Sequence, residues 1–245
     1  VAFKKAAFEE YLKKGGFPEL FEVKNSRGYI QGLFDSIIRK DIQQRFKIRY
    51  IESLRMLANH MIDNFGQEII YSDLAERFGF GSSHTAENYV SYLKQTYLLL
   101  GIHKFSFKSK ERIRNEKSYV VDTAFITERD DAMNGQNIGW KLENITYVEL
   151  LRRNKPLFYD VFYYREQYEI DFVVNKGFKR YYIQSAFALP DREKVLQEER
   201  PFLNISDSFK KIIIEKTNIH SYYTEEGILV LSIFFFFLNE NSLEI

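Results

Sequence analysis

Residues 168–186, YEIDFVVNKGFKRYYIQSA, constrain the fold of this chain more than any other stretch. They read as two short strands joined by a turn, so this part of the chain must belong to a β-sheet. Side chains two residues apart in a strand share a face, so Glu169 and Asp171 point the same way. Gln184 and Ala186 likewise share a face of the second strand. The segment therefore predicts a β-hairpin that carries an acid pair.

The N-terminal part of the chain follows the helical period instead. Apolar spacing predicts one helix before the glycines and proline of residues 15–18, and a second helix over residues 27–45. The second helix contains the basic run IIRKDIQQRFKIR, which we interpret as a solvated helix face. Residues 1–50 are therefore expected to form a helical segment.

Residues 51–126 show the element order of a winged helix-turn-helix, which is a helix, a short helix, a longer helix and a β-hairpin. The expected elements are helices at 51–65, 72–80 and 82–99, followed by strands at 101–109 and 117–125. In such a fold the third helix can enter the major groove of DNA, and the hairpin tip can touch phosphates.

Polar and basic side chains occupy both of these positions. The residues predicted to contact nucleic acid are His84, Asn88, Ser91 and Lys94 on the helix, and Lys108, Lys110, Arg112 and Arg114 on the hairpin tip. Contacts between such cations and phosphates would make the binding of duplex DNA sensitive to salt. Winged helices also serve as protein–protein modules, and that alternative stays open.

Residues 127–245 predict a third region with an α/β arrangement. A polar loop at 127–139 leads into an amphipathic helix at 140–153, and strands, a polar helix and further strands follow. The stretch GILVLSIFFFF at 227–237 is expected to be a strand. The fold class is therefore α+β, with a mixed sheet flanked by helices in its last region.

The hairpin and the helix at 140–153 predict one candidate site. Glu143 on that helix is expected to close a cluster with Asp171, and the amide of Gln184 adds a neutral oxygen. Such oxygen ligands suit a hard cation such as Mg²⁺, which could polarise a phosphodiester and generate hydroxide. A Lys would help to position the attacking water, but position 186 is Ala. The alternative is an alternating strand whose polar face is merely solvated.

Composition excludes several classes of function. The chain has no Cys, which rules out disulfides, thiolate zinc sites and Cys nucleophiles. With 35 Lys and Arg against 34 Asp and Glu, only a local patch could attract a polyanion. No secretory signal or membrane-spanning run appears, so we expect a cytoplasmic protein without membrane contact. Because the chain starts with Val rather than Met, we expect a piece of a longer protein.

Several segments, taken in order, resemble the C-terminal region of a family of prokaryotic AAA+-type ATPases. The segments are YLKKGGFPEL, FDSIIRKDIQQRFKI, HTAENYVSYLKQTYLL, KSYVVDTAF, GWKLENITYVELLRR, YEIDFVV and YYIQSAF. The resemblance covers nearly the whole chain. It implies a winged helix followed by a domain similar to PD-(D/E)XK nucleases, whose site positions match Glu143, Asp171, Gln184 and Ala186. Residues 1–50 would be a remnant of the ATPase lid.

The chain departs from that family pattern in two ways. It contains no GxxxxGK[ST] loop, so ATP and its Mg²⁺ would belong to an absent ATPase core. The nuclease-like strand has Gln184 and Ala186 in place of Glu and Lys. A base relocated to Lys176, Lys179 or Lys194 is an alternative that the sequence leaves open.

Three functions follow from these observations. The first is a DNA-associated regulatory region of an ATPase, with a nuclease-like domain that no longer cuts. The second is a protein-interaction or assembly module, with the ATPase core or a second copy of the chain as its partner. The third is an active Mg²⁺-dependent nuclease that uses Glu143, Asp171 and Gln184.

Overall fold

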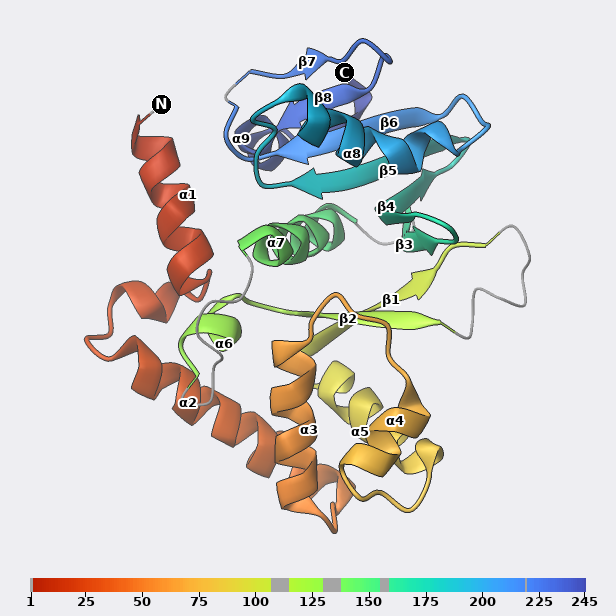
Figure 1. The fold of residues 1–245 in the computed structure, drawn as a ribbon. Helices are drawn as coiled ribbons and strands as arrows, with labels where there is room; N and C mark the ends of the chain where they lie inside the picture. Colours follow the sequence, from red (N-terminus) through yellow and green to blue (C-terminus); the bar gives the residue numbers. More distant parts are fainter. Residues whose placement is uncertain (1, 107–114, 130–137, 155–158, 219) are drawn as a thin grey trace. The chain divides into compact units, whose positions relative to one another are not determined.

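A computed structural model describes residues 2–106, 115–129, 138–154, 159–218 and 220–245. It contains helices and a mixed sheet, which confirms the α+β class (Figure 1). Contacts within the chain define two compact units. Unit 1 comprises Val1–Gly101 and Glu116–Gln136, and unit 2 comprises Ile102–Asn115 and Asn137–Ile245.

Unit 1 begins with four helical elements: α1 (Ala2–Lys14), the 3₁₀ turn η1 (Pro18–Phe21), α2 (Ser26–Ser36) and the π-helix η2 (Ile37–Gln44). Helix α1 ends at Lys14 and is followed by Gly15, whose φ of +89° places it in the left-handed region. A Cβ atom there would lie 2.0 Å from the Asp122 carboxylate, so only glycine fits. Helix α2 is capped by Asn25, whose side chain accepts a hydrogen bond from the Gly28 amide at 2.9 Å.

The rest of unit 1 has the expected order of helices and strands as far as Val120, but helix α6 (Ala124–Thr127) replaces the end of the strand predicted at 117–125. The elements before α6 are α3 (Ile51–Asp63), α4 (Tyr71–Arg77), α5 (Ser83–Gln95), β1 (Leu99–Lys104) and β2 (Glu116–Val120). Helix α5 begins after Ser82, whose hydroxyl accepts a hydrogen bond from the Thr85 amide at 3.2 Å. Leu54, Ala58 and Leu93 are fully buried between these helices.

Unit 2 holds most of the sheet. Its elements are α7 (Ile138–Arg153), β3 (Asp160–Arg165), β4 (Glu169–Lys176), β5 (Lys179–Ala186), α8 (Arg192–Leu203), β6 (Lys210–Glu215), β7 (Tyr222–Tyr223), β8 (Leu229–Ser232), α9 (Ile233–Leu238) and the 3₁₀ turn η3 (Ser242–Glu244). Hydrogen bonds order its strands β1-β3-β4-β5-β6-β8-β7, with residues 102–104 of β1 in this unit. Strands β3, β4 and β5 are antiparallel neighbours, whereas β5–β6 and β6–β8 are parallel.

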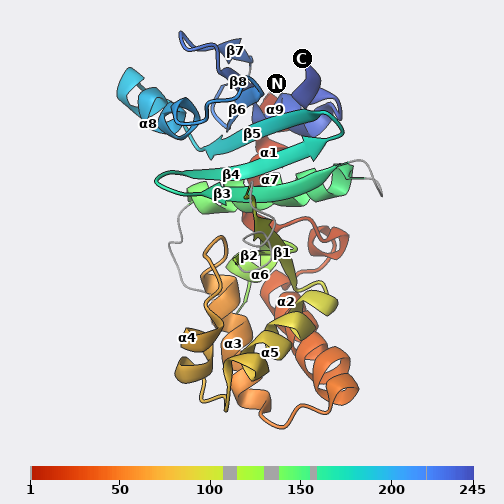
Figure 2. The ribbon, with the colours of Figure 1, turned by 90° about the vertical axis from the view of Figure 1, so that its right-hand side faces the viewer.

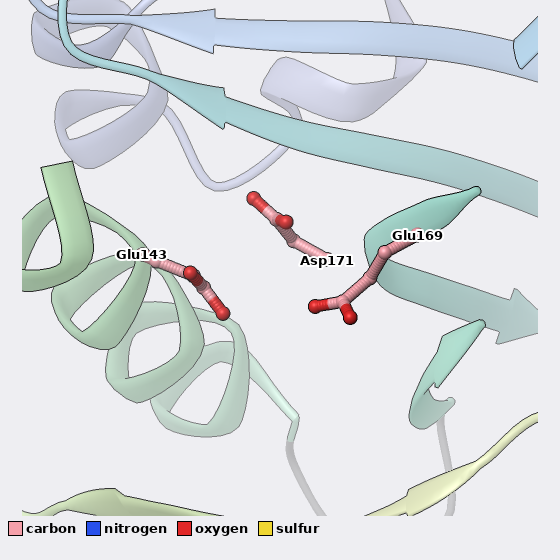
Figure 3. Close-up of side chains that lie close together, drawn as sticks. All are labelled: Glu143, Glu169 and Asp171. Carbon is pink, nitrogen blue, oxygen red and sulfur yellow. The ribbon is translucent and has the colours of Figure 1, made fainter. Parts of the chain in front are cut away.

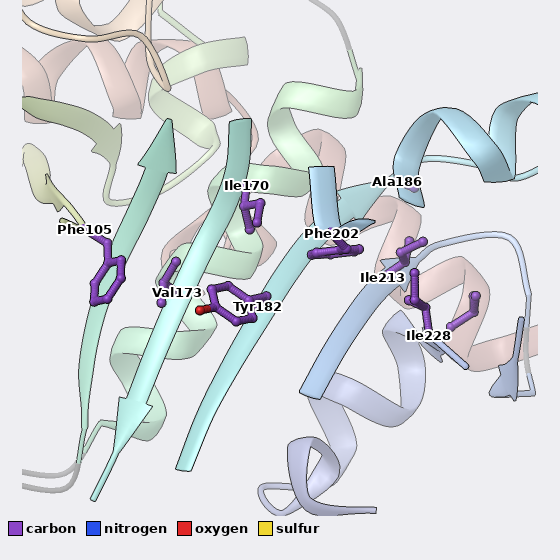
Figure 4. Close-up of a cluster of buried hydrophobic side chains, with 9 residues drawn as sticks. Phe105, Ile170, Val173, Tyr182, Ala186, Phe202, Ile213 and Ile228 are labelled. Carbon is purple, nitrogen blue, oxygen red and sulfur yellow. The ribbon is translucent and has the colours of Figure 1, made fainter. Parts of the chain in front are cut away.

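Helices α7 and α8 cover opposite faces of β4. Tyr147 of α7 stacks on Phe172 with ring centroids 5.8 Å apart. The next residue, Val173, belongs to a buried cluster with Tyr182 and with Phe202 of α8. Figure 2 shows α7 running along the sheet, and Figure 4 shows the cluster on the α8 side. Because both faces are covered, the middle of β4 is buried on both sides.

The stretch at 227–237 corrects one prediction. Only Leu229–Ser232 form a strand, β8, and Ile233–Leu238 form helix α9. Aromatic residues favour strands, which misled the sequence interpretation. Ile233 and Phe236, three residues apart, are the buried side chains, and that spacing suits a helix. Among the described residues, no helix combines the length and apolar character needed to cross a membrane.

Candidate metal centre in unit 2

Three carboxylates converge at one end of the β4–β5 hairpin. Glu143 comes from helix α7, whereas Glu169 and Asp171 are the first and third residues of strand β4 (Figure 3). Each can offer one oxygen such that all three oxygens lie within 4.8 Å of one another. The structure thus brings together Glu143 and Asp171, the pair predicted as metal ligands, and it adds Glu169.

Asp171 is held in place by the neighbouring strand. Its carboxylate accepts a hydrogen bond from the Ser185 amide at 2.7 Å, and its own amide donates to Gln184 Oε1 at 3.3 Å. Its side chain is buried, with 6% of the residue exposed. Asp171 is therefore not part of a solvated strand face. Glu169 is partly exposed, and its Oε2 lies 3.6 Å from Arg165 Nε, so it is more solvated than Asp171.

A cleft of about 670 Å³ opens next to Glu143 and Asp171. Helix α7, the end of β5 and the start of α8 form its walls. Its acidic lining residues are Glu143, Asp171, Asp191, Glu193 and Glu198, and Lys194 is the basic lining residue among those described. A phosphate entering this cleft would meet like charge unless a cation accompanied it. The electrostatics therefore favour a cation as the first ligand.

Gln184, the predicted amide ligand, forms a hydrogen bond within the hairpin. Gln184 lines the cleft, but its oxygen faces the Asp171 amide at 3.3 Å, so it helps to orient Asp171. Glu169 brings the third carboxylate of the cluster. The shared strand face of Glu169 and Asp171 was the sequence signal for it, because residues i and i+2 point the same way.

The three lysines considered as relocated bases have different positions. Lys176 and Lys179 lie at the turn of the hairpin, where both bind Glu244, at 2.5 and 2.8 Å. Lys194 alone of the three lines the cleft, and its ammonium lies 2.6 Å from Glu198. Ala186 is 2% exposed and belongs to the buried cluster of Figure 4. Ala186, at the strand position of the expected Lys, therefore packs in the core and also lines the cleft.

The residues predicted to contact nucleic acid lie in unit 1 or outside the described residues. Lys108, Lys110, Arg112 and Arg114 fall in the undescribed stretch 107–114. On α5, His84 is exposed, and Asn88 and Ser91 are partly exposed. Lys94 binds the carboxylate oxygens of Glu116 at 2.7 and 2.9 Å. Because Glu116 is buried and also accepts from the Tyr71 hydroxyl at 3.0 Å, Lys94 serves this internal pair.

Comparisons with known proteins give relatives along most of the chain. A family profile described as a domain of unknown function, DUF8612, matches residues 5–132. An uncharacterized protein of Haemophilus influenzae is 30% identical over 84% of this chain and 52% of its own length. The uncharacterized protein MJ1544 of Methanocaldococcus jannaschii is 29% identical over 89% of this chain and 49% of its own length.

The matched relatives are longer than this chain. The chain spans about half the length of both relatives. No solved structure matches it significantly. None of the descriptions names an ATPase or a nuclease, so both likenesses stay predictions from the sequence.

Proposed function

The chain belongs to the family defined by the domain of unknown function DUF8612, and we propose that its unit 2 is a nuclease-like domain that binds a divalent cation. Through that cation it would hold the phosphates of duplex DNA without cutting them efficiently. One observation carries the proposal, namely the convergence of Glu143, Glu169 and Asp171 within 4.8 Å.

The donor set fits a hard divalent cation such as Mg²⁺ or Mn²⁺. All three side chains offer carboxylate oxygens, which these ions prefer, and no Cys is present in the chain to favour softer metals. Three ionised carboxylates this close repel one another, and a bound cation relieves the repulsion. When bound, the cation would polarise a phosphate oxygen and neutralise charge on the phosphodiester.

Weak cleavage follows from what surrounds the carboxylates. Phosphodiester hydrolysis needs a group that orients water and balances charge developing in the transition state. Ala186 can do neither, and the ammonium of Lys194 is held 2.6 Å from Glu198. We therefore propose that the centre binds DNA more readily than it hydrolyses it.

The larger protein context extends this proposal. The matches cover 52% and 49% of the two relatives, which leaves room for another domain in each of them. Together with the motifs that resemble AAA+-type ATPases, this supports a regulatory region that acts with an ATPase core. That core would supply the ATP chemistry, since this chain has no phosphate-binding GxxxxGK[ST] loop.

Titration of the chain with Mn²⁺, followed by electron paramagnetic resonance, tests the metal centre directly. We expect one strong site in the wild type and none in Asp171→Asn, which keeps the side-chain shape and its bond from Ser185. Glu193→Gln removes the same charge from the cleft but lies outside the carboxylate cluster, so it should change the affinity only slightly. Equal Mn²⁺ binding by wild type and Asp171→Asn would refute the centre.

DNA binding and cleavage are then measured on the same samples. We expect Mn²⁺ to strengthen the binding of a labelled duplex to the wild type but not to Asp171→Asn, and the duplex to stay intact. Rapid cleavage that depends on Asp171 would replace this proposal with an active nuclease. If Mn²⁺ neither binds nor affects DNA, the assembly-module interpretation would take its place.

A further inference from the structure

One charged surface of unit 1 takes no part in the metal centre. Residues 39–49, RKDIQQRFKIR, form what we call the basic segment. Its cations are Arg39, Lys40, Arg45, Lys47 and Arg49, and all five are exposed. Asp41 is its one acidic residue. Among the described residues, none of the five cations forms an ion pair, whereas Lys94 and Arg129 of the same unit do.

Packing fixes the direction of these cations. The segment begins within the π-helix η2, and Ile37, Ile38 and Ile42 anchor the inner side of that helix in the core. Arg39 and Lys40 therefore occupy its outer side, and the exposed Arg45, Lys47 and Arg49 follow the end of the helix. π-Helices are rare and occur frequently at functional sites, which makes the location of this one notable.

The basic segment lies beside α5, the helix predicted to read DNA. Phe46 of the segment stacks on Tyr92 of α5, with ring centroids 3.9 Å apart and planes 12° apart. Tyr92 follows Ser91, one of the polar residues predicted to contact DNA. Because Lys94 is neutralised by Glu116, α5 lacks free positive charge of its own at that position. The basic segment can supply the missing charge.

We propose that the basic segment is a phosphate-contacting surface for duplex DNA, next to α5. The inference deepens the proposed DNA association but does not depend on the metal centre of unit 2. Exposed cations next to one another suit the repeated charges of a nucleic-acid backbone. The guanidinium groups of Arg45 and Arg49 also lie over the rings of Phe46 and Tyr50, at 5.2 and 5.7 Å.

Lys47 provides a variant whose folding is not in question. Its φ is +53°, in the left-handed region, which Asn adopts more readily than Lys. Lys47→Asn therefore removes one cation without adding backbone strain. If Lys47 serves only the fold, Lys47→Asn should leave DNA affinity unchanged. If Lys47 contacts a phosphate, the substitution should weaken DNA binding.

The test measures fluorescence anisotropy of a labelled duplex with the whole chain, in EDTA and over a series of salt concentrations. The main variant is the triple substitution Arg39→Gln, Lys40→Gln and Arg45→Gln. Its matched control removes three exposed lysines from α1, as Lys4→Gln, Lys5→Gln and Lys13→Gln. Both triple variants change the net charge equally, so a non-specific loss would affect them alike.

We expect the main variant to lose DNA affinity about tenfold or more at low salt, and the control to lose much less. The slope of log affinity against log salt should fall by about 0.9 for each phosphate contact removed. Lys47→Asn should reduce the slope by about 0.9 with an unchanged melting temperature.

Several outcomes would overturn the inference. Absence of duplex binding in EDTA would do so, as would equal losses in the two triple variants. If polyglutamate displaced the labelled duplex as strongly as unlabelled duplex does, at matched ionic strength and charge, the partner would be an acidic protein instead. Mn²⁺ binding by unit 2 is measured without DNA, and DNA binding by the basic segment is measured in EDTA. A negative result in one experiment therefore does not refute the proposal that the other experiment tests.

Discussion

The two units differ in where charges of one sign gather. In unit 1 the buried charges of Arg129 and Glu116 are paired, with Asp63 and Lys94 respectively. The cations of the basic segment remain on its surface. Unit 2 also holds a buried opposite pair, Arg153 with Glu149, but in addition it gathers like charges, with three carboxylates at the edge of an acidic cleft. The comparison teaches that the net charge of +1 says little about where a polyanion or a cation can bind.

The difference also separates charges that serve the fold from charges that serve a ligand. A buried opposite pair stabilises the structure only as a pair, because removing one partner leaves a buried charge. A cluster of like charges opposes folding through mutual repulsion, and such clusters are typical of functional sites. Four experiments test this distinction.

The largest effect on stability is expected for Arg129→Met. The Arg129 side chain is fully buried, binds Asp63, and donates to Asn59 Oδ1 at 2.6 Å. Its loss leaves the Asp63 charge uncompensated, which should lower the free energy of unfolding by about 3–5 kcal/mol. Urea denaturation measures this. The double variant with Asp63→Asn should recover part of the loss, and a loss below about 1 kcal/mol would argue against a structural pair.

The second prediction concerns Asp171→Asn, now for stability as well as metal binding. The Mn²⁺ affinity should fall about a hundredfold or more, which corresponds to roughly 2.7 kcal/mol. The free energy of unfolding without metal should stay the same or rise, since one like charge leaves the cluster. A large loss of stability in EDTA would show that Asp171 serves the fold, and the contrast between the units would disappear.

The third prediction is for Glu116→Gln in unit 1. The change removes the partner of Lys94 and weakens the bond from the Tyr71 hydroxyl, which is 3.0 Å long. We expect the free energy of unfolding to fall by about 1–3 kcal/mol. The freed ammonium should raise duplex affinity a few-fold at low salt, as anisotropy can measure. The double variant Glu116→Gln with Lys94→Gln should lose that gain.

The smallest effect is a pH dependence at the end of unit 2. Hydrogen bonds from Lys176 and Lys179 hold the pKa of Glu244 at about 2, below its usual value of 4.5. A depressed carboxyl pKa stabilises the fold above pH 4.5, and this contribution is lost as the pH falls from 4.5 towards 2. Because all three side chains are partly exposed, we expect at most about 1 kcal/mol.

Glu244→Gln provides the control for that experiment. Its unfolding free energy should depend less on pH between 4.5 and 2 than that of the wild type. Denaturation in urea at a series of pH values measures the difference. Identical pH profiles would mean that the pairs with Lys176 and Lys179 contribute nothing measurable.

The sequence predicted a good part of the fold and of the candidate site. The spacing of apolar residues predicted the order of helices and strands, because the helical and strand periods can be read from neighbouring residues alone. The i, i+2 rule placed Glu169 and Asp171 on one face of β4, and the hairpin put Gln184 beside them. The position of Glu143 came from the family resemblance and from its place on the helix before the sheet.

Other features depend on contacts between distant residues and could not be predicted. The pairing of Lys94 with Glu116 joins α5 to β2, so periodicity along either element does not show it. The burial of Asp171 depends on helices covering both faces of β4. The choice of helix over strand at 233–238 depends on which side chains find a buried environment, which propensity alone does not specify.

The distribution of the three carboxylates over α7 and β4 has a thermodynamic consequence. An unfolded chain cannot hold Glu143 next to Asp171, so a cation that needs both binds only the folded form. By mass action, a ligand at one hundred times its dissociation constant adds about 2.7 kcal/mol to the stability of the folded form. The concentration of free divalent cations around the protein would then set how long unit 2 survives heat or proteases.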